Sequence, residues 1–156
     1  MLATIHRAEN TDIPYRLNKI LDALSKIQCS IVFPIHPRTR SCIEAYGIEL
    51  GRNIIPIEPV GYLDMLALEG GARKIITDSG GVQKEAFFLG TPCITVRDET
   101  EWIETVEDRW NIVAGCDENR ILYAIESEQG KAVQKSPYGN GNAAEIICSF
   151  IEGYLR

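Results

Sequence analysis

The strongest constraint on the fold of this 156-residue chain is a regular alternation of short apolar runs with segments of helical periodicity. The apolar runs are short and bounded by turn residues, which is typical of buried strands, whereas the segments between them repeat apolar residues at helical spacing. This alternation predicts a doubly wound α/β domain with a mostly parallel, Rossmann-like sheet. We expect strands at 1–6, 29–35, 53–57, 74–77, 92–96 and 111–114, and helices at 13–27, 38–46, 62–72, 79–90, 101–107 and 118–127.

Several polar or turn-forming residues fall at or just after the ends of the predicted strands. In a sheet of this class, ligands bind at the carboxyl ends of the strands. We therefore expect these residues to converge on one edge of the sheet; they are His6, His36, Pro59, Asp78 and Arg97.

The segment Thr77–Glu85 predicts a strand, a tight glycine turn and a helix. Ser79 can cap that helix, and Gly80 and Gly81 allow a ligand to approach the backbone closely. The free amides at the start of such a helix form an anion site, and Glu85, more than one turn further on, can accept hydrogen bonds from sugar hydroxyls. This spacing suits a nucleotide, although a capped helix without any ligand gives the same pattern.

The segment 6–10 follows the first predicted strand and places an imidazole, a guanidinium and a carboxylate within one turn. His6 and Arg7 can hold a phosphate, and His6 can transfer a proton. The alternative is an ordinary helix start in which Glu9 and Asn10 act as caps and Arg7 is solvated.

Two further candidates have equally simple structural alternatives. His36 stands between Ile35 and Pro37, where a histidine is often only a rigid turn residue. Arg97 can bind phosphate or pair with its neighbour Asp98, and the acidic residues that follow it are expected to be surface charge.

Composition excludes several classes of protein. A net charge of −6, without any basic stripe, disfavours nucleic-acid binding. The five cysteines include no Cys-x-x-Cys pair, so we expect free thiols in a reducing, cytoplasmic compartment and no metal site. No apolar run is long enough to span a membrane.

Six segments, taken in order, closely resemble the non-hydrolysing UDP-N-acetylglucosamine 2-epimerase family, and the resemblance covers essentially the whole chain. Any one of them is a weak signal, but six in register are specific. They are 4–10 (TIHRAEN), 34–37 (PIHP), 58–63 (EPVGYL), 77–85 (TDSGGVQKE), 97–101 (RDETE) and 136–141 (SPYGNG).

The resemblance is to the C-terminal domain of a two-domain enzyme with a GT-B-like fold. It implies an isomerase that interconverts UDP-N-acetylglucosamine and UDP-N-acetylmannosamine by eliminating and re-adding UDP, without a cofactor, in the synthesis of cell-surface polysaccharides. It also implies a homodimer, and a missing N-terminal half that carries the acids for proton transfer at C2. We accordingly expect a UDP-binding domain at 1–135, inactive alone, followed by a loop and a helix at 136–156. The helix has an apolar face formed by Ala144, Ile147, Cys148, Ile151 and Leu155, and it either packs on this sheet or crosses to the missing half.

The resemblance also assigns roles to matched positions. Ser79, Gly80 and Gly81 hold the diphosphate, and Glu85 binds the ribose. His6, the predicted catalytic residue, contacts the phosphate region.

The same matching frames the uracil with the loop from Pro59 to Tyr62 and with Met65. Arg97 belongs to the predicted UDP site as a phosphate partner. Arg7 and His36 match positions that contact a second, activating substrate molecule in bacterial members.

The sequence departs from the family pattern at two positions. Many members have an arginine that contacts the diphosphate where this chain has Trp102, and the segment 100–104 resembles a branch that includes epimerases of diacetamido uronic acids. A second arginine common after the His-Arg pair is Ala8 here. The alternatives are therefore an epimerase of such a related UDP-sugar, a GT-B glycosyltransferase domain, and a non-catalytic sensor of nucleotide sugars.

Overall fold

The computed structural model describes residues 1–107, 109–130 and 137–154 and shows a six-stranded sheet, every strand parallel to its neighbours, in the order β3-β2-β1-β4-β5-β6. This confirms the predicted doubly wound α/β class. The strands are β1 (Leu2–Thr4), β2 (Ile31–Pro34), β3 (Ile54–Ile57), β4 (Ile75–Thr77), β5 (Cys93–Thr95) and β6 (Asn111–Val113).

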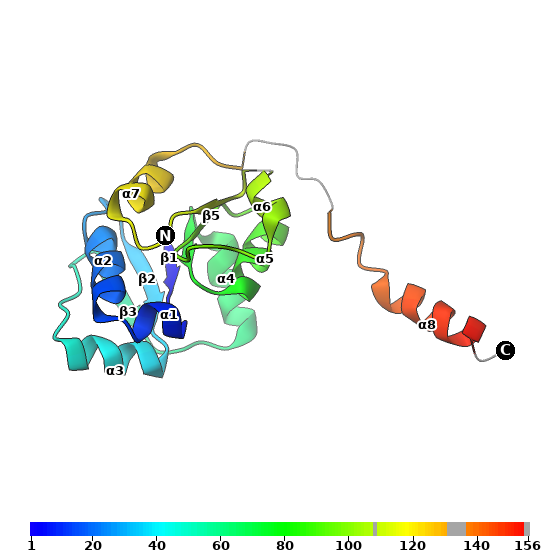
Figure 1. The fold of residues 1–156 in the computed structure, drawn as a ribbon, viewed down its shortest axis with the longest axis horizontal. Coiled ribbons are helices and arrows are strands. Elements are labelled where there is room, and N and C mark those ends of the chain that lie inside the picture. The colour runs from blue at the N-terminus through cyan, green and yellow to red at the C-terminus, as the bar shows by residue number, and fades with distance from the viewer. Residues whose placement is uncertain (108, 131–136, 155–156) are drawn as a thin grey trace.

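Helices connect these strands and cover both faces of the sheet (Figure 1). The described helices are α1 (Ala8–Thr11), α2 (Pro14–Ser25), α3 (Pro37–Tyr46), α4 (Tyr62–Gly71), α5 (Gly80–Leu89), α6 (Ile103–Glu107), α7 (Glu118–Glu126) and α8 (Ala143–Tyr154). Most of the expected elements are present with ends shifted by one or two residues. The short helix expected from residue 101 begins at Ile103, because the Thr100 hydroxyl accepts a hydrogen bond from the Trp102 amide just before it.

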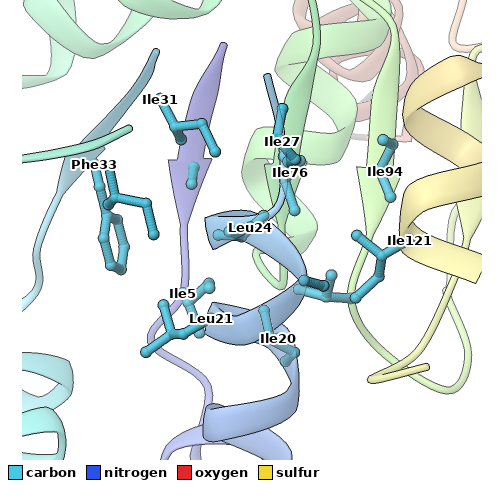
Figure 2. Packing of buried hydrophobic residues seen from close by; sticks show 14 of the residues in the cluster. Ile5, Ile20, Leu21, Leu24, Ile27, Ile31, Phe33, Ile76, Ile94 and Ile121 are labelled. Atoms are coloured by element: carbon cyan, nitrogen blue, oxygen red, sulfur yellow. The ribbon is translucent and has the colours of Figure 1, made fainter. Parts of the chain in front are cut away.

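The strands separate two cores because successive side chains point to opposite faces. Ile76 and Ile94 join the larger core with Leu21 and Leu24 of α2 (Figure 2). Their neighbours in sequence, including Ile75, join the smaller core under α4 and α5. Burial on both faces explains why the central strands read as continuous apolar runs.

The C-terminal segment was expected either to pack on this sheet or to cross to another domain. Helix α8 lies apart from the sheet, and every residue described in it is exposed (Figure 1). Its apolar residues, including Phe150 and Tyr154, are therefore not covered by the rest of the described chain. Three features of the predictions lie outside the described residues. They are the domain boundary at residue 135, Ser136 of the sixth segment and Leu155 of the expected apolar face. No helix described in the structure is long and apolar enough to cross a membrane.

Candidate functional site

The strand order places a ligand-binding edge between β1 and β4. The chain winds from β1 toward β3 on one side and from β4 toward β6 on the other, so the carboxyl ends of β1 and β4 form the switch point where ligands bind in this class of fold. The five strand-end residues expected to converge do follow β1 to β5 in turn. His6 and Asp78 stand directly at the switch point.

Asp78 organises this edge. Its buried carboxylate accepts hydrogen bonds from the backbone amides of His6, at 3.0 and 3.1 Å, and of Arg7, at 3.0 Å. It also accepts one at 3.1 Å from Nδ2 of Asn10, which donates at 2.8 Å to the carbonyl of Val96 as well. The carboxylate therefore ties the turn after β1 to the end of β4.

The same carboxylate orients His6. Nδ1 of His6 lies 3.5 Å from Oδ1 of Asp78, and the His6 side chain is 38% exposed. The other ring nitrogen, Nε2, therefore lies on the side away from Asp78. An imidazole held in this way can present Nε2 to a ligand.

The start of α5 offers backbone donors, as the glycine motif predicted. Ser79 caps the helix by accepting a hydrogen bond from the Val82 amide at 3.4 Å. The amides of Gly80 and Gly81 have no acceptor among the described residues. Unpaired amides at a helix N-terminus, together with the helix dipole, favour an anion.

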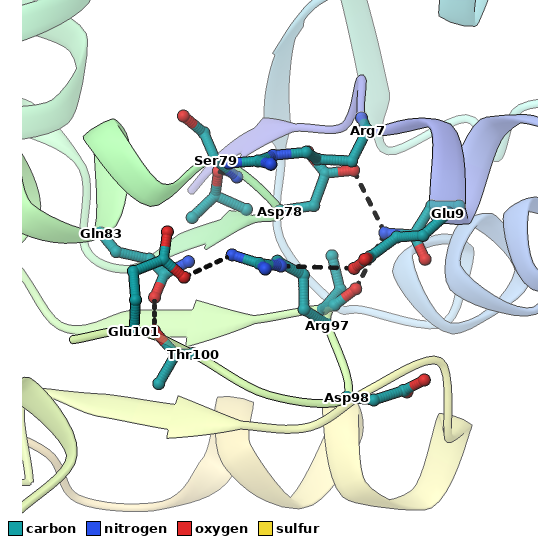
Figure 3. A network of polar contacts seen from close by, with 12 residues as sticks. Arg7, Glu9, Asp78, Ser79, Gln83, Arg97, Asp98, Thr100 and Glu101 are labelled. Carbon is teal, nitrogen blue, oxygen red and sulfur yellow. Dashed lines mark hydrogen bonds and ion pairs between the residues drawn. The ribbon is translucent and has the colours of Figure 1, made fainter. Parts of the chain in front are cut away.

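A carboxylate of the chain itself lies beside these amides. A Cβ atom added at Gly80 would lie 2.5 Å from Oε1 of Glu101, so the absence of a side chain at Gly80 allows this close approach. Oε2 of Glu101 accepts a hydrogen bond at 2.8 Å from Arg97, whose Nε lies 3.3 Å from Oε1 of Glu9 (Figure 3).

These contacts set the charge of the pair. The pKa of Glu101 is lowered by a backbone hydrogen bond and, against the effect of burial, by Arg97 and Arg7. Burial by itself lowers the pKa of Arg97, but Glu101 and Glu9 raise it. The start of α5, which is positively polarised by the helix dipole, therefore lies near charged side chains of two other segments: the loop after β5, with Arg97 and Glu101, and α1, with Glu9.

A cavity of about 150 Å³ opens at the same edge, and His6, His36, Pro59 and Met65 are among the residues that line it. The rings of His6 and His36 are 5.8 Å apart between centroids. His36 also caps α3, since its Nδ1 accepts a hydrogen bond from the Arg38 amide at 3.2 Å. The turn role and the site role of His36 are therefore compatible.

Tyr62 does not line this cavity, and its side chain is largely exposed. It lies beside Glu85 of α5, and the negative charge of Glu85 is the largest cause that raises the pKa of the phenol. Of the predicted uracil-framing residues, the structure thus gathers Pro59 and Met65 around the cavity and places Tyr62 with the predicted ribose residue.

The structure excludes two local alternatives and adds a contact to one expectation. Arg97 does not pair with Asp98, because Asp98 is bound by both terminal nitrogens of Arg16, at 3.0 and 3.1 Å. Glu101 is exposed, as expected of surface charge, but it also pairs with Arg97 and lies over Gly80. Asn10 is not a helix cap but is fully buried in the Asp78 network.

Sequence reasoning placed Asp78 at this edge without assigning it a role, and it assigned no role in the site to Asn10 or Gln83. Gln83 is buried on α5, and its Oε1 accepts hydrogen bonds from Thr100 at 2.6 Å and from Asn111 at 3.2 Å. It therefore holds the loop that carries Arg97 and Glu101 against α5. The signal available in the sequence was a polar residue in or next to each apolar or helical segment. A polar side chain that is buried there needs a hydrogen-bond partner.

A larger, open hollow of about 710 Å³ lies elsewhere, beside the outer strand β6, where Arg109, Arg120 and Tyr123 line it. It contains none of the predicted site residues. The switch point carries the oriented histidine and the free amides, so it is the better candidate site.

The comparisons with known proteins point to one family. The sequence profile of the UDP-N-acetylglucosamine 2-epimerase family matches residues 1–152. A UDP-N-acetylglucosamine 2-epimerase homolog from Methanococcus maripaludis is 48% identical over 152 residues, covering 94% of this chain and 43% of the relative. The UDP-2,3-diacetamido-2,3-dideoxy-D-glucuronate 2-epimerase of Pseudomonas aeruginosa is 46% identical, covering 97% of this chain and 44% of the relative.

A solved structure of the Methanocaldococcus jannaschii UDP-GlcNAc 2-epimerase in complex with UDP-GlcNAc and UDP superposes with a TM-score of 0.88 at 40% identity. The match covers 97% of this chain and 44% of that structure, so the chain spans less than half the length of the relatives it matches and corresponds to one domain of a GT-B-like enzyme. The profile match, the sequence relatives and the shared fold together show that this chain belongs to the UDP-N-acetylglucosamine 2-epimerase family.

Proposed function

We propose that this chain is the UDP-binding half of a UDP-sugar 2-epimerase and that the nucleotide binds at the switch point between β1 and β4. The observation that carries the proposal is the set of unpaired amides at the start of α5, next to the oriented His6, in a chain whose structural relative was solved with UDP-GlcNAc and UDP. The free amides form an anion site, and membership of the family suggests that the anion is the diphosphate of UDP.

The diphosphate is proposed to lie over Ser79, Gly80 and Gly81. His6 contacts it through Nε2, because Asp78 holds the Nδ1 side of the ring. The side chain of Arg97 is 12% exposed and pairs with Glu101, which lies next to Gly80 at the start of α5. The guanidinium can therefore turn from that carboxylate to a phosphate oxygen.

The nucleoside is proposed to extend from α5 toward the 150 Å³ cavity. Glu85 accepts hydrogen bonds from the ribose hydroxyls, and Tyr62, which lies beside Glu85, closes this side. Pro59 and Met65 are in the lining of the cavity and frame the uracil.

The proposed reaction is elimination followed by re-addition. A base removes the proton from C2, the bond between C1 and the diphosphate oxygen breaks, and a 2-acetamidoglucal and UDP result. UDP then adds back to C1 while C2 is protonated from the other face. Negative charge develops on the departing diphosphate, and pre-positioned donors such as the α5 amides and His6 stabilise it. The groups that move the C2 proton belong to the missing half.

Two sugars are supported as substrates. The relatives at 48% and 46% identity carry the names of a UDP-N-acetylglucosamine 2-epimerase homolog and of a diacetamido-glucuronate epimerase, so similarity does not separate the two. We favour UDP-N-acetylglucosamine because it is the sugar named for the family, and treat the uronic acid derivative as the second candidate. Arg7 and His36 are proposed to contact a second, activating substrate molecule.

The proposed partners follow from the length of the match. The remaining half of the enzyme completes the site, residues 136–156 cross to it, and the full protein is a homodimer. The uncovered apolar residues of α8 support the crossing. A cytoplasmic location and a role in supplying precursors of surface polysaccharides are part of the same proposal.

The test is to combine this chain with the N-terminal half of the enzyme in deuterium oxide and to follow C2 of each candidate UDP-sugar by NMR. Epimerisation exchanges the C2 proton for deuterium, and we expect exchange only when both halves are present. Transfer of the sugar to an added acceptor would indicate a glycosyltransferase. Binding without either reaction would indicate a sensor, and turnover by this chain alone would contradict the half-enzyme proposal.

A further inference from the structure

The indole N–H of Trp102 has no acceptor in the described part of the chain. Its Nε1 atom is buried, and a Cβ atom added at Gly80 would lie 3.3 Å from it. The group thus lies against the first residue of α5, where the amides of Gly80 and Gly81 are also free.

The position of the indole ring is fixed from several directions. The Trp102 amide donates to Oγ1 of Thr100 at 3.1 Å, and its carbonyl accepts from Oγ1 of Thr105 at 2.7 Å. The ammonium group of Lys84 lies 4.4 Å from the ring centroid, and the ring of Tyr138 stands almost perpendicular to it at 5.9 Å. The cation–π contact and the edge contact both stabilise this placement. The N–H is therefore held ready at the start of α5.

A buried donor without an acceptor is costly, so such groups usually have a partner in the functional state. Glu101 brings its Oε1 to the same glycine, yet it accepts no hydrogen bond from the indole. A bound ligand can supply the acceptor, and the free amides of Gly80 and Gly81 at the same place favour an anionic one.

We propose that the indole N–H of Trp102 donates a hydrogen bond to a phosphate oxygen of the bound nucleotide and so adds a side-chain donor to the amides of Gly80 and Gly81. The proposal rests on the nucleotide site proposed above. It makes Trp102 a determinant of affinity for the diphosphate rather than for the base, since the nucleoside lies toward the cavity lined by Pro59 and Met65.

The chain provides an internal control. Its second tryptophan, Trp110, also has a buried Nε1 atom without an acceptor among the described residues. Its ring lies at the opposite end of α5, 3.8 Å from where a Cβ atom on Gly90 would be. A ten-residue helix is roughly 15 Å long, so Trp110 reports on the fold without touching the proposed site.

The first test uses the unmodified chain, labelled with nitrogen-15, and follows its two indole N–H signals by NMR while UDP is added. Trp102→Phe and Trp110→Phe assign the signals. We expect the Trp102 proton to move downfield, as on forming a hydrogen bond to phosphate, while the Trp110 proton stays in place. An unmoved Trp102 signal at saturating UDP would overturn the proposal.

The second test is calorimetric titration of both variants with UDP, UDP-N-acetylglucosamine and uridine, after circular dichroism has shown that they fold. Phenylalanine keeps the ring over Lys84 but lacks the donor. Because hydrogen bonds to charged groups are strong, Trp102→Phe should weaken UDP roughly 10- to 100-fold and leave uridine unchanged. Trp110→Phe should change neither.

The outcomes separate the two proposals. If the unmodified chain binds UDP and uridine with the same affinity, the proposed nucleotide site is wrong. If it binds UDP more tightly than uridine and Trp102→Phe binds UDP as tightly as the unmodified chain does, only the role of Trp102 is wrong. A loss confined to UDP-N-acetylglucosamine would place the acceptor on the sugar and would equally overturn the assignment to phosphate.

Discussion

Glu69 gives the sharpest prediction about stability. This α4 residue is fully buried, and neither of its carboxyl oxygens has a hydrogen-bond partner among the described residues. Burial, and then the negative charge of Glu85, raises the pKa of its carboxyl from 4.5 to about 7. Holding a charge there is costly, so the folded chain keeps the proton over a pH range in which the unfolded chain has lost it.

The sign and size follow from this difference in proton binding. As pH rises from 4.5 toward 7, only the unfolded state loses the proton, so the free energy of unfolding falls. Above about pH 7 the folded state loses it too, and the deficit stays constant. A pKa shift from 4.5 to about 7 lowers the free energy of unfolding at pH 8 by about 3 kcal/mol relative to acid pH.

Glu69→Gln removes the titration. We compare the free energy of unfolding of the variant with that of the parent chain, relative to their difference at acid pH. We expect the difference to move in favour of the variant by less than about 1 kcal/mol at pH 5 and by about 3 kcal/mol at pH 8. For a chain of this size that is roughly 6–12 °C in Tm at pH 8. Urea and thermal unfolding, followed by circular dichroism from pH 5 to 8, measure it, with the exposed Glu44→Gln as control. An offset between variant and parent that does not change with pH would refute the reasoning.

Three predictions concern the site and use UDP titration calorimetry. Glu85→Ala should weaken UDP by roughly 1–3 kcal/mol, because charged hydrogen bonds to the ribose are lost, with Glu44→Ala as control; unchanged affinity would remove Glu85 from the site. Glu101→Gln should strengthen UDP binding, since it removes a negative charge beside Gly80; weaker binding would show instead that Glu101 positions Arg97. Asp78→Asn should cost roughly 1–3 kcal/mol of folding stability and also weaken UDP, because hydrogen bonds that hold His6 and Asn10 are lost; a fully stable variant would contradict the organising role of this carboxylate.

The parts of the fold that the sequence predicted are those set by local rules. Strand and helix periodicity gave the parallel sheet, and Ser79 with two glycines gave the capped start of α5. The edge on which the polar residues gather followed from the class of fold, because parallel strands end at the same edge.

The parts that sequence reasoning missed depend on contacts between distant segments. Asn10 reaches Asp78 across 68 positions of the sequence, and no local pattern reports such a pairing. Glu101 looked like one acid among several, and only the folded chain shows that Arg97 holds it over a glycine. The indole of Trp102 became a candidate donor only when its burial was known.

The tail shows a different kind of limit. Its apolar spacing correctly predicted helix α8, but periodicity records only that one face needs a partner. Phe150 and Tyr154 remain exposed in the described chain, and the relatives are more than twice its length. The proposed crossing to the other half of the enzyme would give this face its partner.

The most direct test of the central claim is a calorimetric titration of this chain with UDP beside uridine. We predict that UDP binds with an affinity that depends on its phosphates, that uridine binds more weakly, and that Ser79→Ala narrows the difference by removing the cap of α5. Equal affinities for UDP and uridine, from a chain shown to be folded, would contradict a diphosphate site at the start of α5.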